Sequence, residues 1–390
     1  MEPLEQWHVL SAYVRFHQWL GFQPYRLEDG TVSPFLAQTL LQFVGVAGNL
    51  ALIVYRRRCI LYHCQEIGSV VDFIKLLTVI LADVVLYVEL YRTVQNVCSC
   101  WSALYKVHRT LDAKGMLDHR LLKRTIRWYW ICLVGTFLYL LGSEGYCYLR
   151  ADEMQTKRFY LYFFGLHYVL HLKEQHLVYP AIMLNLYLRM THAALEHHVE
   201  LLQHSERLGS ERYLEFLAGK INSLKLLHTD LFKATTELND AIGNSYLIIY
   251  FKNYIQIISN SYWVVFWLLN NNPDHAGRIF SRLLIRLLLL GLVFHVNTQA
   301  MDTCDRFRYR LHTIGLEIQL RSKRLFVMIE SFILQTGVES IRLTAGGCFE
   351  LNYKPILTVV LTVAAYISIF IQQAVYDISR VDCFIDDADC

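Results

Sequence analysis

Long apolar stretches recur along the whole chain and alternate with charged segments. An α-helix needs roughly 20 mostly apolar residues to cross the hydrocarbon core of a bilayer. Stretches of about this length or longer cover residues 35–55, 67–90, 128–149, 159–188, 242–269, 283–300 and 355–376. The pattern therefore predicts an all-α membrane protein with seven transmembrane helices.

The region between the fourth and fifth stretches, residues 189–241, is too polar to span a membrane. Its apolar residues nevertheless recur at spacings of three and four between charged neighbours, as in an amphipathic helix. These residues are Leu214, Leu217, Ile221, Leu224, Leu227 and Leu231. We expect cytosolic helical extensions here, whose apolar stripe packs either within the chain or against a second subunit.

The distribution of basic residues predicts an orientation. Lys and Arg gather in residues 92–127 and again in 306–324, which lie on one side of the membrane if seven helices cross it. Because cytoplasmic loops are enriched in Lys and Arg, the N terminus is predicted to be cytoplasmic and the C terminus external. The acidic end of the chain, residues 378–390, agrees with this orientation, whereas the arginines at 56–58 follow the first stretch directly and disagree with it.

Composition supports the membrane assignment, with 54% hydrophobic and only 18% charged residues. The formal net charge of +3 is spread over the loops, so a nucleic-acid partner is not expected. The ten cysteines are scattered, and Cys98 and Cys100 have no second pair at zinc-finger spacing. We therefore expect no disulfide framework, no metal site and no cofactor, and the lipid bilayer is the expected environment.

The last apolar stretch carries a recognisable motif. A Phe and an Asn precede a Tyr and a Gln that lie six residues apart, at positions Phe349, Asn352, Tyr366 and Gln372. A Tyr and a Gln alone can hydrogen-bond to a neighbouring membrane helix and would indicate little. At this spacing and in the final helix, the motif resembles the C-terminal signature of insect gustatory receptors, which reads Thr-Tyr, five mostly hydrophobic residues, then Gln-Phe.

Two positions depart from that signature, since Ala365 replaces the Thr and Gln373 replaces the Phe. The resemblance implies a taste or chemosensory receptor subunit that acts as a ligand-gated cation channel in the plasma membrane of sensory neurons. It implies a homo- or hetero-tetramer of related subunits, gated by a small-molecule tastant, in which the last helix lines the pore. By position in the motif, the pore and gate residues would be Tyr366, Ile369, Gln372 and Gln373.

The same resemblance implies a division of the chain. We expect a cytoplasmic N-terminal segment, a six-helix ligand-sensing domain that includes the 189–241 extensions, a basic cytosolic anchor, the pore helix and an external acidic tail. These parts cover residues 1–34, 35–300, 301–345, 346–377 and 378–390 respectively.

Ligand-binding candidates lie in the predicted external halves of the peripheral helices, where the family's ligand cavity is expected. They are Tyr139, Glu144, Tyr146, Phe163, Phe164, His167, Tyr262, Trp263, Trp267 and Arg286. Tyr and Trp also gather at bilayer interfaces without binding a ligand, and this alternative stays open for the aromatic residues. Glu144 and Arg286 are the sharper candidates, because a charge inside the membrane needs a specific reason.

Two other functions fit parts of the pattern. A G-protein-coupled receptor also has seven helices, but the final stretch lacks an Asn-Pro pair followed by Tyr, and a cytoplasmic N terminus reverses the required geometry. A membrane di-iron oxygenase would use clustered histidines. In the predicted topology His167 and His171 lie in the outer part of the membrane and His192 to His204 in the cytosol, so they would not share a metal. No catalytic residues are therefore expected, and the protein is predicted not to be an enzyme.

Overall fold

The computed structural model describes residues 66–150, 154–204, 211–318 and 323–378, together with short pieces of the first 65 residues. These pieces are 12–13, 15–17, 25–28, 31–34, 40, 44, 47–48 and 51. Most of the predicted first transmembrane stretch, the arginines at 56–58 and residues 379–390 therefore lie outside the described residues. So do the side chains of Glu144, Phe163, Phe164, His167, Leu214 and Gln373.

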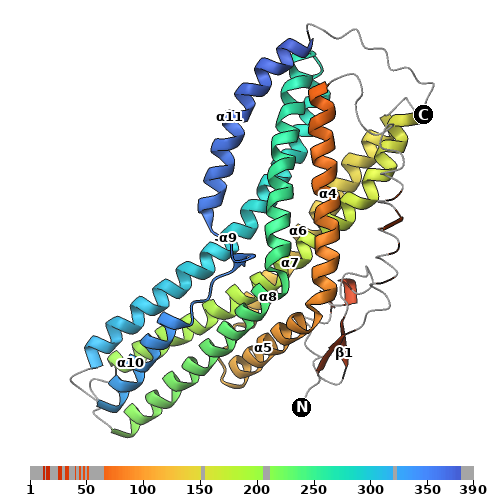
Figure 1. Ribbon diagram of the computed structural model, residues 1–390. Helices are drawn as coiled ribbons and strands as arrows, with labels where there is room; N and C mark the ends of the chain where they lie inside the picture. The colour runs from red at the N-terminus through yellow and green to blue at the C-terminus, as the bar shows by residue number, and fades with distance from the viewer. Residues whose placement is uncertain are drawn as a thin grey trace.

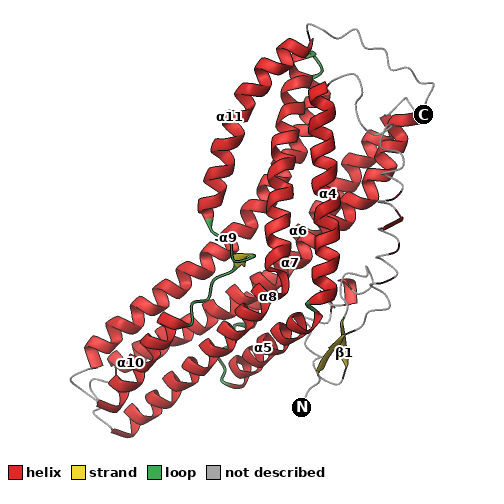
Figure 2. Cartoon of the chain, viewed as in Figure 1, coloured by secondary structure: helices red, strands yellow, loops and turns green. Residues whose placement is uncertain are grey.

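Helices dominate the described chain (Figure 2). They are α4 (Glu66–Arg92), α5 (Val94–Ala113), α6 (His119–Arg150), α7 (Met154–His204), α8 (Glu211–Leu269), α9 (Pro273–Ile318), α10 (Lys323–Val338) and α11 (Tyr353–Ile378). Two small antiparallel hairpins join β1 (Tyr25–Glu28) to β2 (Thr31–Pro34), and β3 (Thr344–Ala345) to β4 (Phe349–Glu350). This agrees with the predicted all-α fold.

Several helices begin where the sequence supplies a capping residue. The Asp118 carboxylate accepts from the backbone N–H groups of Arg120 and Leu121, at 2.9 and 3.0 Å, at the start of α6. The Asn272 side chain accepts from the N–H of His275 (3.2 Å) just before α9, and that of Asn352 from the N–H of Lys354 (3.0 Å) just before α11. Side-chain acceptors thus satisfy backbone donors that a helix leaves free at its first turn.

The three longest helices run through most of the molecule (Figure 1). α8 rises from the lower end to the top, and α9 returns from the top to the lower end, where α10 packs against both. α4 lies along the upper half of α8, α5 lies beside its lower half, and α11 stands in the upper half on the other side. Two described segments, His119–Ser143 and Pro273–Gly315, are long and apolar enough to cross a membrane, and Tyr353–Ile369 is a shorter apolar helix.

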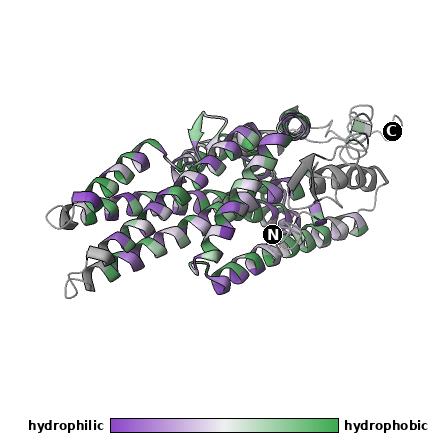
Figure 3. Ribbon diagram, turned by 90° about the horizontal axis from the view of Figure 1, so that it is seen from below, coloured by the Kyte–Doolittle hydropathy of each residue, from purple (hydrophilic) through white to green (hydrophobic). Residues whose placement is uncertain are grey.

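The predicted amphipathic extensions are continuous with the apolar helices on either side. α7 runs on to His204, and α8 begins at Glu211 and passes without a break into its apolar half. The stripe residues Leu217, Ile221 and Leu224 are buried within the chain, as are Leu227 and Leu231. For this stripe, packing within the chain is therefore the correct alternative. In Figure 3 the helices of this end carry both hydrophilic and hydrophobic residues, as amphipathic helices do.

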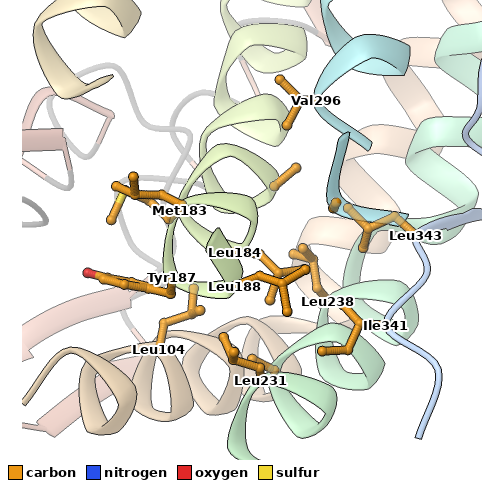
Figure 4. Close-up of a cluster of buried hydrophobic side chains, with 14 of the residues drawn as sticks. Leu104, Met183, Leu184, Tyr187, Leu188, Leu231, Leu238, Val296, Ile341 and Leu343 are labelled. Carbon is orange, nitrogen blue, oxygen red and sulfur yellow. The ribbon is translucent and has the colours of Figure 1, made fainter. Parts of the chain in front are cut away.

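The core joins α5, α7, α8 and α9 to the segment that follows α10 (Figure 4). Leu184 and Leu188 of α7 lie near Leu238 of α8, and Ile341 and Leu343 reach the same cluster from the connecting segment. Both connecting residues are almost fully buried. The chain between α10 and α11 is thus held by the hydrophobic core.

Candidate functional site

A buried ion pair lies between α4 and α7. The Lys173 ammonium contacts Asp83 Oδ1 at 3.1 Å, and neither side chain is more than 5% exposed. The same ammonium lies 3.0 Å from the centroid of the Tyr87 ring, as in a cation–π contact. Lys173 thus has two partners in place of water, whereas Asp83 Oδ2 has no hydrogen-bond partner among the described residues.

A second buried pair joins α7 to α8, where the Lys252 ammonium donates to the Glu174 carboxylate. The Arg286 guanidinium of α9 is close enough to act electrostatically on both Lys252 and His171. Charges from α4, α7, α8 and α9 therefore converge inside one bundle. Charged and polar groups inside membrane helices commonly line functional cavities or connect moving parts.

Farther along the α4–α8 contact, hydrogen bonds to neutral side chains replace the ion pairs. Trp263 Nε1 donates to Asp72 Oδ1 at 3.0 Å, and the Lys75 ammonium donates to Asn260 Oδ1 at 3.4 Å. Asp72 and Lys75, three residues apart on α4, interact electrostatically with each other, and each also binds a residue of α8. A polar row thus follows one face of α8 through much of its apolar half.

Gln256 belongs to this row. Its side chain is fully buried, and neither amide atom has a hydrogen-bond partner among the described residues. Its amide is therefore available to water or to a polar ligand group. The sequence prediction missed Gln256, although the spacing of Lys252, Gln256, Ser259 and Trp263 at three and four residues was a usable signal for a polar helix face.

The predicted ligand residues fall into separate groups. The Tyr139 hydroxyl donates to Ser281 Oγ (2.5 Å), which joins α6 to α9, and Tyr146 lies near Arg278 and is 46% exposed. Tyr262 and Trp263 are buried together, with ring centroids 5.2 Å apart.

Trp267 contacts the His275 ring at a centroid distance of 4.6 Å, at the turn between α8 and α9. Arg286 acts on the Lys252 pair, away from that turn. The structure thus packs Trp267 against the cluster of Tyr262, Trp263 and Phe266, but it does not gather all the described candidates around one point.

The predicted pore residues lie near the end of α11. Tyr366 is 42% exposed, Ile369 is 49% exposed, and Gln372 is also exposed. Exposed apolar residues extend towards the base of the same helix, at Leu357 (62%) and Leu361 (63%). Exposed residues therefore lie around much of α11, since Tyr366 is on the opposite side of the helix from Leu357.

The β3–β4 hairpin at the base of α11 is bound to α8. Asn239 Nδ2 donates to the Arg342 carbonyl at 2.8 Å, and Asn239 Oδ1 accepts from the Thr344 N–H at 3.0 Å. One amide side chain thus holds two backbone groups of the hairpin. The sequence prediction used this region only as part of the motif and did not identify Asn239.

Close backbone packing adds to this attachment. A Cβ placed on Gly243 of α8 would lie only 3.2 Å from the Gly346 backbone nitrogen, and Gly346 itself has a φ of +56°, which favours glycine. Farther up α8, the Tyr250 hydroxyl donates to the Pro355 carbonyl (3.2 Å), and its ring meets Phe349 edge-on at 4.9 Å. The hairpin and the base of α11 are therefore both attached to α8.

Two cavities flank the same connection. A narrow, mainly apolar cavity between α7, α8 and α9 is bordered by Tyr250, Phe294 and Leu351, with Glu174 and Asn253 as polar neighbours. A polar cavity of about 260 Å³ lies between α8, α9 and the end of α10, and continues along the segment to Arg342. Neither cavity is bordered by a predicted ligand residue.

Two histidines, the half-buried His108 and the buried His228, lie in the region predicted to be cytosolic. Burial lowers the pKa of His108 from 6.5 to about 4, and its Nδ1 lies 3.1 Å from the Tyr187 hydroxyl. Burial also lowers the pKa of His228, although Glu339 at 3.4 Å acts in the opposite direction. Among the residues that the structure describes, no group of three or more His, Cys, Asp or Glu side chains could hold a metal ion.

Comparison with known proteins shows which proteins share this sequence and fold. Gustatory receptor 23a of Drosophila melanogaster is 26% identical over 176 residues, which cover 43% of this chain and 45% of the relative. The match thus spans less than half of the relative's length. In fold, the chain is similar to the olfactory receptor OR5 of Machilis hrabei, solved in complex with eugenol, with a TM-score of 0.60 and 12% identity.

That structural match covers 93% of this chain and 99% of the olfactory receptor chain. The sequence profile of the 7tm chemosensory receptor family matches residues 10–376, almost the entire sequence. The chain therefore belongs to the 7tm chemosensory receptor family, the membrane-embedded receptors that include the insect gustatory and olfactory receptors.

Proposed function

We propose that this chain is a taste receptor subunit in the plasma membrane of sensory neurons, and that it forms a ligand-gated cation channel. Four related subunits would surround one pore, with α11 of each facing the centre. The seven membrane helices would comprise residues 35–55 and the apolar parts of α4, α6, α7, α8, α9 and α11. The N terminus would be cytoplasmic and the C terminus external.

The observation that carries this proposal is the exposed surface of α11. Leu357 and Leu361 could face lipid, but the exposed Tyr366 and Gln372 are poor neighbours for hydrocarbon. A water-filled pore shared by several copies of α11 suits both kinds of residue. A ring of Ile369 would close such a pore by excluding water, and rings of Gln372 and Gln373 would replace part of an ion's hydration shell.

The ligand would enter the peripheral domain. The olfactory receptor with a similar fold was solved with eugenol, and by analogy a small organic molecule suits the candidate region here. Tyr262 and Trp263 offer rigid aromatic surface beside the polar row of α8, in which Gln256 has an unused amide. A partly polar ligand that reaches both would find stacking and hydrogen bonding together.

Attachment of the hairpin to α8 supplies a physical route from ligand to pore. A shift of α8 would carry Gly243 and Tyr250 with it, and these residues hold the hairpin and the base of α11. The anchor, residues 301–345, contains the end of α9 and all of α10, which pack on each other and would keep the lower end fixed.

The identity of residue 373 affects whether this subunit can form a closed channel on its own. The family signature has an aromatic residue at this position, and a polar ring lowers the barrier to wetting of a closed gate. We propose that this subunit works with a related partner that supplies the bulky residue. Homotetramers would then leak cations without ligand, and Gln373→Phe would abolish the leak; tight closure of unmodified homotetramers would contradict the idea.

The decisive experiment expresses the chain in a cell line without endogenous receptors and records cation current across a panel of tastants. A ligand-evoked current whose cation selectivity changes in Gln372→Ala would support the channel. Tags at both termini test the topology in the same cells. An N terminus that is accessible from outside, or a response that requires G proteins and carries no current of its own, would refute the proposal.

A further inference from the structure

The polar cavity of about 260 Å³ near the end of α10 has a lining suited to an anion. Four charged residues border it, two of each sign: Asp305 and Arg308 from α9, and Glu339 and Arg342 from the segment after α10. Their formal charges balance, so what the cavity can bind depends on which groups already have partners.

Glu339 is already well satisfied. Its Oε2 accepts from Gln335 Nε2 at 2.6 Å and from Thr229 Oγ1 at 3.3 Å, and it lies 3.4 Å from His228 Nδ1. These contacts disperse the negative charge of the carboxylate along α8 and α10. Glu339 therefore offers little attraction to a cation that enters the cavity.

Arg308 is in the opposite situation. Its guanidinium makes no hydrogen bond or ion pair with any residue that the structure describes, and it lies across Gly337, 3.3 Å from the position that a Cβ would take. A glycine at this point leaves room for the planar group at the cavity wall. Its five N–H donors remain available.

Arg342 adds a second set of donors. One terminal nitrogen binds the Glu350 carboxylate of the β3–β4 hairpin, which leaves the other N–H groups of the guanidinium free for a further acceptor. Asp305 is the remaining carboxylate at the cavity, and it acts electrostatically on Arg342. Arg308 and Arg342 thus both have unused donors at the cavity. Asp305, the one remaining carboxylate, accepts no hydrogen bond from any residue that the structure describes.

Arg306 precedes the cavity residue Arg308 by two positions on α9, whereas Arg310 and Arg324 already pair with Glu196 and Glu215. Guanidinium groups bind phosphate oxygens in a bidentate manner, more strongly than they bind neutral acceptors. A volume of about 260 Å³ also exceeds the space of a few water molecules, at roughly 30 Å³ each.

We propose that this cavity is a second ligand site, distinct from the tastant site, which binds a phosphate monoester between Arg308 of α9 and Arg342 of the connection to the pore helix. The phosphate would belong either to a soluble metabolite or to the headgroup of a phosphorylated lipid. An occupant would fasten the connecting segment to α9. The binding itself does not depend on the channel function proposed above.

The test measures thermal unfolding of the full-length receptor in phosphatidylcholine nanodiscs. One arm titrates inorganic phosphate against sodium chloride of equal ionic strength, and the other replaces about 5% of the lipid with a phosphoinositide. Arg308→Gln is compared with Arg306→Gln, a matched loss of charge two residues away. Arg306 donates to the Asp302 carbonyl of its own helix and does not border the cavity.

We expect phosphate or the phosphoinositide to raise the unfolding temperature of the unmodified receptor and of Arg306→Gln. In Arg308→Gln the same shift should require about tenfold more ligand, because a charge-assisted bidentate contact is lost. The arm that produces this Arg308-dependent shift identifies the source of the phosphate. Absence of a shift in both arms, or an equal shift in both variants, would overturn the proposal.

Discussion

Replacement of Gly243 by alanine tests whether α8 holds the hairpin at the base of α11. The new Cβ would lie 3.2 Å from the backbone nitrogen of Gly346 and 3.4 Å from its Cα. These atoms belong to backbone that Asn239 and the buried Leu343 hold in place, so they have little room to withdraw. We expect the new methyl group to be overpacked against the hairpin backbone and to weaken the contact between the hairpin and α8.

The magnitude follows from two opposing effects. Alanine in a helix interior is more favourable than glycine by about 1 kcal/mol. Overpacking against fixed atoms costs about 1–3 kcal/mol. Gly219 lies in the same helix, and a Cβ added there would meet no atom within 4 Å, so Gly219→Ala gains the first effect without the second. The two variants should therefore differ by about 1–3 kcal/mol in the free energy of unfolding.

Thermal unfolding of the purified receptor measures this difference, and recordings of ligand-evoked current measure its functional consequence. Gly219→Ala should unfold at or above the temperature of the unmodified protein, with an unchanged ligand response. Gly243→Ala should unfold at a lower temperature than Gly219→Ala and shift the ligand concentration for half-maximal current. Equal unfolding temperatures for the two variants would refute the close contact between α8 and the hairpin.

Two further predictions concern ionisable residues. Asp83→Asn and Lys173→Met should each destabilise the fold by about 3–5 kcal/mol, because each leaves an unpaired charge buried. The double variant leaves no such charge, so its loss of stability should be clearly less than the sum of the two single losses. Additive losses in unfolding measurements would disprove the pairing. Because the pKa of His108 is lowered to about 4, the unfolded chain takes up a proton below pH 6.5 while the folded state does not. The free energy of unfolding should therefore fall by about 1–2 kcal/mol between pH 7 and 4.5, a value reduced for partial solvent exposure. His108→Gln should flatten this dependence, and an unchanged pH profile would count against the assignment.

Helix positions were predictable because apolar length and periodicity report directly on burial. The stripe from Leu217 to Leu231 is buried as its spacing predicts. The ends of the helices were less predictable. Hydropathy changes near residues 188 and 242, but α7 and α8 continue through both points, because an amphipathic surface sustains the same helix outside an apolar stretch.

Partners across the bundle could not be read from spacing. The sequence places Asp72 and Lys75 on one helix face, but only the packing of α4 on α8 brings them to Trp263 and Asn260. The β3–β4 hairpin left a clearer signal. Gly346 and Gly347 both have positive φ, and paired glycines between short extended segments are typical of a tight hairpin turn.

The arrangement of α8 connects the two halves of the proposed mechanism. Trp263 and Gly243 are twenty residues apart on one uninterrupted helix, a separation of about 30 Å at 1.5 Å per residue. Trp263 belongs to the aromatic group beside α4, and Gly243 touches the turn of the hairpin that precedes α11. Because a helix is stiff along its axis, a displacement at one end reaches the other without a chain of rearranged side chains. Under the proposed function, α8 is therefore the most direct mechanical link between ligand and gate, and the buried pairs to α4 and α7 set how freely it moves.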